Sequence, residues 1–163
     1  MRVLGIDPGY GRIGWGIIEG EKATWKHIAH GCIETDASNS FVVRLATLES
    51  DLQDVVTKYN PNVAGMETLF FKKNVTTGLD VAHARGVMLL LLHKNGVPVR
   101  DIKPVEVKQA VTGHGGAEKT QVQHMVAMLL GLPEKRMQDD AADALGAAIY
   151  LSGQLHMIEK GCV

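Results

Sequence analysis

The sequence predicts an α/β fold in which helices flank a mixed five-stranded sheet. Two observations support this prediction. Short apolar runs that end at turn residues predict strands, and longer segments with apolar residues every three or four positions predict helices. The first three strands follow one another directly, whereas later strands alternate with helices, which is typical of a mixed sheet. No repeat or linker interrupts the 163 residues, so a single domain over residues 1–157 and a frayed tail over 158–163 are expected.

The opening of the chain contains three predicted strands. Residues 2–7 are apolar and β-branched and stop at a Pro-Gly pair, so Asp7 should lie at the C-terminal tip of a strand. The apolar segments 13–18 and 24–33 flank a turn-like stretch at 19–22, as in an antiparallel hairpin. A three-stranded meander is therefore expected.

The middle of the chain alternates helices and strands. Apolar residues recur with helical spacing over 38–59, where an Asn-Pro pair ends the helix. Residues 62–67 form a buried strand, which places Glu67 at a C-terminal tip. The segment 79–92 is apolar around more than one helical face, so this helix needs cover on two sides. The sheet covers one side; a second subunit is expected on the other, although a buried monomeric core is the alternative.

The last third of the chain contains one more strand and three helices. Glycine and proline mark their ends, because glycine commonly follows a helix and proline suits its first turn. The predicted elements are a strand over 97–102, a short helix from Pro104 towards Val111, a glycine-rich loop over 113–116, a helix over 117–130 and an alanine-rich helix from Asp139 to about Met157.

Composition excludes several classes of protein. The longest apolar run, 87–92, is too short to cross a membrane, and the first residues lack the layout of a signal peptide, so a cytoplasmic location is expected. Cys32 and Cys162 lie far apart, which gives neither a disulfide framework nor a zinc signature. The net charge of −1 argues against a uniformly basic nucleic-acid binder. Two divalent cations bound to four carboxylates would change that charge to +3, so local charge matters more.

Four carboxylates predict a metal site. Asp140 and Asp143 stand three positions apart on one helix face, although the attraction of a helix N-terminus for anions explains this pair equally well. Asp7 and Glu67 each end a strand, and ligand sites in α/β folds gather beyond strand carboxyl ends. Four carboxylates brought together repel one another unless cations neutralise them, and an all-oxygen cluster suits Mg²⁺ or Mn²⁺. Two such ions are the known arrangement for phosphodiester hydrolysis.

Four sequence blocks together resemble the RuvC family. The resemblance runs from Arg2 to about Tyr150, and the blocks occur in the family's order and spacing. They are LGIDPG at 4–9, the Met-Glu pair that ends at Glu67, GAEKTQVQHMV at 116–126 and QDDAADAL at 138–145. The resemblance implies a ribonuclease H-like nuclease domain that acts as a homodimer. It also implies magnesium-dependent cleavage of Holliday junctions, which are four-way DNA junctions, by paired symmetric nicks in recombination and repair, in partnership with RuvA and RuvB.

The resemblance also assigns the catalytic residues. Asp7, Glu67, Asp140 and Asp143 match the family's metal-binding carboxylates, which are expected to hold two Mg²⁺ ions, with Mn²⁺ as a substitute. Asp139 departs from the pattern, because it adds a carboxylate where the family often has a small residue. Its four-residue spacing to Asp143 also puts both on one helix face. The register favours Asp140, and a role of Asp139 in binding or perturbing the metal stays open.

The DNA-binding residues implied by the resemblance are Phe70, Lys108 and Lys119, and Lys73 is a further candidate because it is a basic residue beside the predicted metal site. Phe70 either packs in the core or stacks on an unpaired base, and we expect stacking. The lysines are either solvated surface charges or phosphate ligands. Lys119 lies near the start of a predicted helix, where backbone amides already favour anions, which supports phosphate binding.

Three other functions were weighed against junction cleavage. A ribonuclease H-type enzyme would use a similar carboxylate cluster, but the 116–126 block argues against it. An actin-like ATPase would need two lobes, for which the chain is too short, and no Walker-type motif occurs. A non-catalytic junction-binding protein would lack a carboxylate, and all four are present. The seven histidines show no ligand spacing, and His124 is expected to be packed or exposed rather than catalytic.

Overall fold

A computed structural model describes residues 1–21, 24–69, 75–133 and 137–159. Its centre is a five-stranded sheet of order β3-β2-β1-β4-β5. Strand β1 pairs antiparallel with β2, and β2 with β3, whereas β1–β4 and β4–β5 are parallel. The predicted mixed sheet and its opening meander are therefore confirmed.

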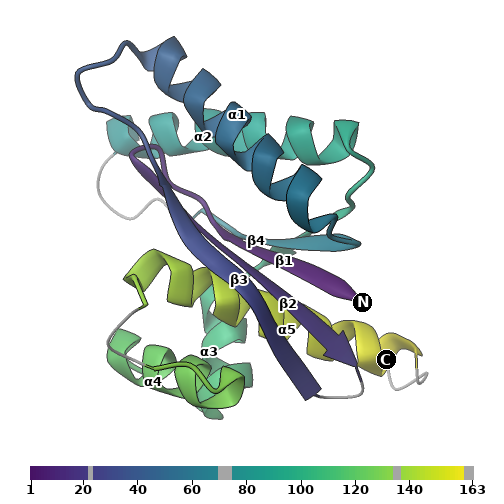
Figure 1. Cartoon of the computed structure of the whole chain (residues 1–163). Coiled ribbons are helices and arrows are strands. Elements are labelled where there is room, and N and C mark those ends of the chain that lie inside the picture. The colour runs from purple at the N-terminus through teal and green to yellow at the C-terminus, as the bar shows by residue number, and fades with distance from the viewer. Residues whose placement is uncertain (22–23, 70–74, 134–136, 160–163) are drawn as a thin grey trace.

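The elements follow the predicted order with shifted ends. The strands are β1 (Arg2–Asp7), β2 (Arg12–Glu21), β3 (Thr24–Glu34), β4 (Val63–Glu67) and β5 (Val99–Ile102). The helices are α1 (Phe41–Tyr59), α2 (Val75–Lys94), α3 (Pro104–Thr112), α4 (Lys119–Leu130) and α5 (Asp139–Glu159). Helices cover both faces of the sheet, with α1 and α2 on one face and α5, backed by α3 and α4, on the other (Figure 1).

Two predicted strand ends were wrong. The first hairpin is longer than expected, because the ladder between β2 and β3 continues past residue 18 to the pair Glu21 and Thr24. The opposed charges of Glu19 and Lys26 suit this pairing, so the expected turn at 19–22 is largely strand. Strand β5 starts two residues later than predicted, because Pro98 has no amide hydrogen for the ladder.

Three helix starts also differ from the prediction. Helix α1 begins at Phe41 rather than at residue 38, because Ser40 has an extended backbone. Helix α4 begins at Lys119 rather than at 117, since the side chain of Gln121 accepts a hydrogen bond from the Glu118 amide at 2.9 Å and fixes the first turn there. Helix α2 begins at Val75, before the predicted start. The first turn consists of β-branched residues, which favour helices less, so the sequence pattern did not indicate a helix there.

Two apolar clusters hold the layers together. One lies between the sheet and α1 and α2 and contains Leu4, Ile6, Leu48, Met88 and Leu92, all at most 1% exposed. The other lies between the sheet and α3, α4 and α5 and contains Val3, Ile18, Val126 and Leu145, all completely buried. Successive residues of β1 therefore face opposite clusters, as the strand period requires. Within the described residues, no helix is long and apolar enough to cross a membrane.

Glycines let α5 approach the sheet closely. A side chain at Gly5 of β1 would collide with the backbone carbonyl of Ala144, and one at Gly14 of β2 with the carbonyl of Asp140. Buried alanines line α5, among them Ala141, Ala144 and Ala148. This contact between a glycine-lined face and an alanine-lined helix fixes where the first turn of α5 lies relative to the strand tips.

Candidate active site

Strand pairing brings Asp7 and Glu67 to the same level. Asp7 ends β1 and Glu67 ends β4, and the two parallel strands are in register, with Ile6 opposite Met66. Asp7 and Glu67, which follow this pair, are therefore neighbours at the C-terminal ends of the two strands. Side chains alternate between the two faces of a strand, so Asp7 lies on the same face of the sheet as Val3 and Gly5. Helix α5 covers this face.

Helix α5 carries the other two carboxylates over this edge. Asp7 pairs with Gly14 across β1 and β2, and the Asp140 backbone lies directly against Gly14. The first turn of α5 therefore lies over the tip of β1. Asp143 follows one turn later, and its charge acts on both Asp7 and Glu67. The structure thus brings the four predicted carboxylates to one end of the sheet.

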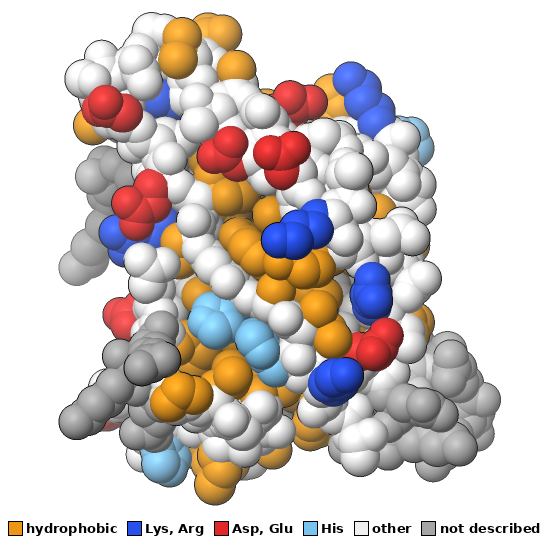
Figure 2. All heavy atoms as spheres, viewed as in Figure 1, with side chains coloured by type: hydrophobic (Ala, Val, Ile, Leu, Met, Phe, Trp, Pro, Cys, Tyr) orange, Lys and Arg blue, Asp and Glu red, His pale blue; other side chains and the backbone are white. Residues whose placement is uncertain are grey.

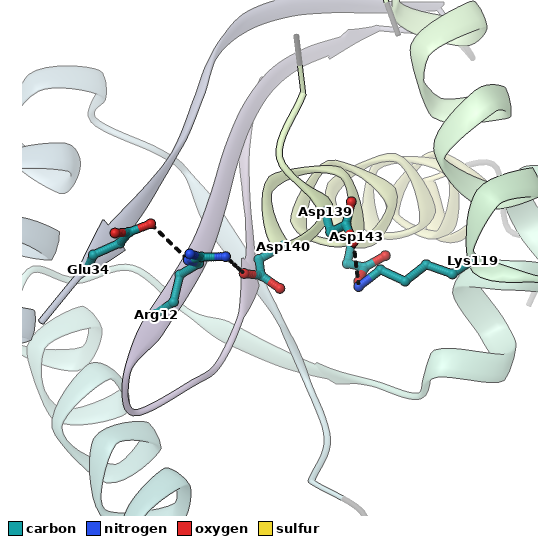
Figure 3. Close-up of polar contacts among 6 residues, drawn as sticks. All are labelled: Arg12, Glu34, Lys119, Asp139, Asp140 and Asp143. Atoms are coloured by element: carbon teal, nitrogen blue, oxygen red, sulfur yellow. Dashed lines mark hydrogen bonds and ion pairs between the residues drawn. The ribbon is translucent and has the colours of Figure 1, made fainter. Parts of the chain in front are cut away.

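Two cationic side chains enter this cluster from neighbouring elements. Lys119, the first residue of α4, places its Nζ 3.0 Å from Asp143 Oδ2. Arg12, the first residue of β2, places its Nη1 3.4 Å from Asp140 Oδ2 and its Nε 2.9 Å from Glu34. Asp140 points towards Arg12, and Asp143 towards Lys119 (Figure 3). Each of the two α5 carboxylates thus has a cationic side chain as its partner.

Burial and mutual repulsion disfavour negative charge at Asp7. Burial, followed by the charges of Glu67, Asp143 and Asp140 in that order, raises the pKa of Asp7 from 3.8 to about 8, and Lys119 opposes this rise. In the absence of other cations, this carboxyl keeps its proton near neutral pH. A divalent cation bound beside a buried carboxyl and other carboxylates would neutralise their charges, so its electrostatic attraction to such a site is strong.

The neighbouring carboxylates respond in the same direction. Burial raises the pKa of Glu67, followed by the charge of Asp143, whereas Lys119 and Lys108 lower it. Burial also raises the pKa of Asp143, against the hydrogen bond from Lys119. At both residues, burial and neighbouring carboxylates therefore outweigh the attraction of the nearby lysines.

A pocket opens beside the carboxylates and contains both predicted lysines of this region. Glu67 and Asp143 line it together with Lys108 of α3 and Lys119 of α4, and its apolar wall consists of Pro104, Val107 and Val122. A pocket lined by both carboxylates and ammonium groups suits a phosphodiester, because lysines can bind its phosphate while carboxylates can hold cations.

The donor set fits a hard divalent cation. All four donors are carboxylates, which suit Mg²⁺ or Mn²⁺ and not a thiolate-bound metal, and the raised pKa of Asp7 marks a shortage of positive charge. Within the described ranges, no three histidine, cysteine or acidic side chains already form a ligand set. Asp140 and Asp143 instead contact Arg12 and Lys119 through their Oδ2 atoms.

The structure also bears on the remaining candidates. Asp139 has 65% of its side chain exposed, against 28% for Asp140 and 26% for Asp143, and its contact with Lys119 is longer, at 3.9 Å. The predicted pair of Asp140 and Asp143 is therefore the pair that faces the cluster. Phe70 and Lys73 lie outside the described residues. His124 lines pockets on the outer side of α4, away from the carboxylates.

Arg12 and Glu34 are the site residues that the sequence prediction missed. Arg12 follows the strand tip that carries Asp7 by five positions, and Glu34 ends β3 directly opposite it in the ladder. A basic residue just after a catalytic strand tip is a weak signal by itself. Its contact with Asp140 spans 128 positions of sequence and follows only from the packing of α5.

Charge is scattered over the molecular surface seen in Figure 2. Acidic and basic side chains surround hydrophobic ones, and the described residues form no continuous basic surface on this face. This agrees with the net charge of −1.

Comparison with known proteins gives one consistent family. The family model for crossover junction endodeoxyribonuclease RuvC matches residues 3–151. A relative of that name from Roseiflexus sp. (strain RS-1) is 44% identical over 163 residues, which is 98% of this chain and 97% of the relative. Another from Chloroflexus aurantiacus (strain ATCC 29366 / DSM 635 / J-10-fl) is 48% identical over 149 residues, which is 91% of each.

A solved structure agrees with these relatives. The structure described as T. thermophilus RuvC in complex with Holliday junction substrate superposes with a TM-score of 0.90 at 30% identity and covers 96% of both chains. The predicted ribonuclease H-like fold is therefore confirmed.

Proposed function

Because the chain belongs to the RuvC family of crossover junction endodeoxyribonucleases, we propose that it is a Holliday junction resolvase that acts in recombination and repair. The single observation that carries this proposal is the convergence of Asp7, Glu67, Asp140 and Asp143 at one edge of the sheet. These residues stand in the sequence blocks that resemble the family. A relative with this fold is described in complex with junction DNA, which supports the choice of substrate.

The proposed reaction is hydrolysis of a DNA phosphodiester that depends on divalent cations, with Mg²⁺ as the natural ion, two ions per site and Mn²⁺ as a substitute. Asp7, Glu67, Asp140 and Asp143 would hold the cations. Two such ions supply activation of the attacking water and stabilisation of the leaving oxygen. The carboxylates need no nucleophilic side chain beside them, and their partly buried position limits access of bulk water to the reacting phosphate.

The lysines of the pocket would hold the DNA backbone. Lys119 is the first residue of α4, so the positive end of the helix dipole adds to the attraction of its ammonium group for a phosphate. Lys108 lines the same pocket as Glu67 and Asp143. We place Phe70, which the family resemblance implies, and Lys73, a basic residue shortly after Glu67 in sequence, in the same DNA-binding surface.

We also propose a homodimer that makes paired symmetric nicks and works with RuvA and RuvB in the cytoplasm. A four-way junction presents equivalent strands related by symmetry, and two subunits related by a twofold axis can cut two of them. Exposed apolar side chains support a second subunit near the start of α1 and α2: Phe41, Val42, Val43 and Leu79 are 36% to 71% exposed.

Substitution of Glu67 tests the catalytic proposal. Glu67→Gln keeps the size of the side chain but removes its charge, so cleavage of a synthetic four-way junction should fall by at least about a hundredfold while junction binding stays measurable. Asp139→Asn is the matched control, because Asp139 is exposed beside the same cluster, and it should retain most of the cleavage. Full activity of the Glu67→Gln protein would refute the assignment of the site.

A further inference from the structure

Arg12 lies between two carboxylates at the edge of the cluster. Its Nε is 2.9 Å from Glu34 and its Nη1 is 3.4 Å from Asp140, so one guanidinium group is shared by a residue outside the cluster and one inside it (Figure 3). The Arg12 side chain is half exposed, whereas that of Asp140 is 28% exposed. Arg12 is therefore accessible enough to move, while the carboxylate that it contacts is fixed by α5.

Lys119 occupies the equivalent place on the other side of α5. Its Nζ contacts Asp143 at 3.0 Å, so each of the two helical carboxylates has one side-chain cation. Each contact engages one oxygen of its carboxylate, the Oδ2 atom, which is a donor that a divalent cation could otherwise use.

We propose that Arg12 is a positioning residue that competes with the divalent cation for Asp140, so that cation binding requires Arg12 to release this carboxylate. The inference rests on the proposed metal-dependent function and adds a control on its metal affinity. Glu34 supports this exchange of partners. It keeps hold of the guanidinium by the shorter of the two contacts, so Arg12 can leave Asp140 without losing all its hydrogen bonds.

Charge and geometry act in the same direction in this competition. The guanidinium repels a divalent cation at the cluster, and it also donates to the Oδ2 atom that the cation would take. Removing Arg12 removes both obstacles. The gain is limited because Arg12 is half exposed and water screens its charge. We expect the Arg12→Gln protein to bind Mn²⁺ about threefold or more tightly than the wild type.

The first test is titration of the full chain with Mn²⁺ by calorimetry, without DNA. Arg12→Gln should tighten the dissociation constant by this factor. Arg2→Gln is the matched control, because Arg2 is also a strand arginine paired with a glutamate, Glu19, with 42% of its side chain exposed. Arg2 lies at the opposite end of β1 from Asp7, so its loss should leave Mn²⁺ affinity unchanged.

Thermal unfolding separates competition from a merely structural role. In chelator, Arg12→Gln should lower the melting temperature, because Asp140 then lacks its cationic partner. In saturating Mn²⁺ most of this loss should disappear, since a cation that binds the variant more tightly stabilises it more. A purely structural role of Arg12 would give the same loss in both solutions, as we expect for Arg2→Gln.

The outcomes distinguish this inference from the proposed function. If the wild type binds Mn²⁺ and cleaves junctions, but Arg12→Gln binds Mn²⁺ no more tightly, the competition is refuted and the proposed function stands. If neither protein binds Mn²⁺, both the metal site and the competition are refuted. Tighter binding by Arg12→Gln, with a melting-temperature loss confined to chelator, supports the inference.

Discussion

Asp7 is the carboxylate of the site whose negative charge folding disfavours most clearly. Its carboxyl is mostly buried, and three further carboxylates act on it, so folding raises its pKa from 3.8 to about 8. The unfolded chain releases this proton near pH 3.8, whereas the metal-free folded chain holds it until about pH 8. The stability that the protonated carboxyl contributes is therefore fully present below pH 3.8 and is lost as the pH rises towards 8.

Asp7→Asn should remove this pH dependence. Asparagine has nearly the same shape and no charge, so the variant in chelator should be more stable than the wild type by about 1 to 3 kcal/mol near pH 8, and by less near pH 5. Urea unfolding at the two pH values measures the difference. A stability gap that stays constant between pH 5 and pH 8 would contradict the burial of a charged cluster around Asp7.

Lys108→Ala should weaken junction binding through the loss of one phosphate contact. The slope of the logarithm of affinity against the logarithm of salt concentration should flatten by about one unit. Lys58→Ala is the control, because Lys58 lies in the last turn of α1, on the other side of the sheet. Binding is measured in chelator, where no cleavage occurs. The same slope for Lys108→Ala and wild type would make Lys108 an ordinary surface charge.

The four carboxylates could be predicted from the sequence, but their cationic partners could not. Asp7 and Glu67 each end an apolar strand. The spacing of Asp140 and Asp143 fits a helix N-terminus equally well, so the register of the RuvC family was needed to favour Asp140 over Asp139. The contact of Arg12 with Asp140 joins residues that are 128 positions apart. No local pattern encodes such a contact, because it depends on how α5 lies across the sheet.

Helix α5 is the element on which the site depends most. It contacts β1, β2 and β4, and it carries Asp140 and Asp143 in its first two turns. Glycines in the strands beneath it allow backbone contact where any side chain would push the helix away. The distance between the strand carboxylates and the helical carboxylates is therefore set by this packing.

Gly14→Ala should displace α5 and damage stability and cleavage together. Its methyl group would meet the backbone of Asp140 and Ala141, which cannot move aside independently, so we expect a loss of about 2 to 4 kcal/mol. Gly86→Ala is the matched control. Gly86 lies within α2 with open space around it, so alanine there should be neutral or stabilise by up to about 1 kcal/mol. Equal stability of the two variants would contradict the close packing of α5.

The elements were predictable where local signals are strong. Apolar periodicity found all five strands and all five helices in order, and the Asn-Pro pair correctly ended α1 at Tyr59. The ends shifted where pairing or capping decided them, as at Glu21 in the first hairpin and at Gln121 in α4. The role of Gly5 and Gly14 was not predicted, because a strand glycine is also compatible with a bulge.

The whole molecule shows an apolar surface that the isolated chain leaves exposed. Phe41 of α1 contacts His83 of α2 edge to face at 5.4 Å, so the starts of these helices lie side by side, with Leu79 54% exposed next to them. The sequence predicted that α2 needs cover on two sides, and the sheet covers one of them.

The strand order could not be read from the sequence, because it is set by contacts between distant segments.

The wild type should sediment as a dimer of 17.6 kDa chains. Leu79→Asp puts a charge into the exposed apolar surface, so it should shift the protein from dimers to monomers. Junction cleavage should fall, while the free energy of unfolding should change little. Met128→Asp, at a residue of α4 that is 59% exposed, should remain dimeric. Analytical ultracentrifugation separates these outcomes. An unchanged dimer in Leu79→Asp would move the subunit interface to another surface.

Cleavage of defined nucleic acids tests the central claim most directly. A synthetic four-way DNA junction, the matching linear duplex and an RNA–DNA hybrid are each incubated with the protein in Mg²⁺ and in chelator. Paired nicks at symmetric positions of the junction, which disappear in chelator and are absent from the duplex and the hybrid, are the predicted result. Cleavage of the hybrid alone, or junction cleavage that persists in chelator, would contradict the assignment of a metal-dependent junction resolvase.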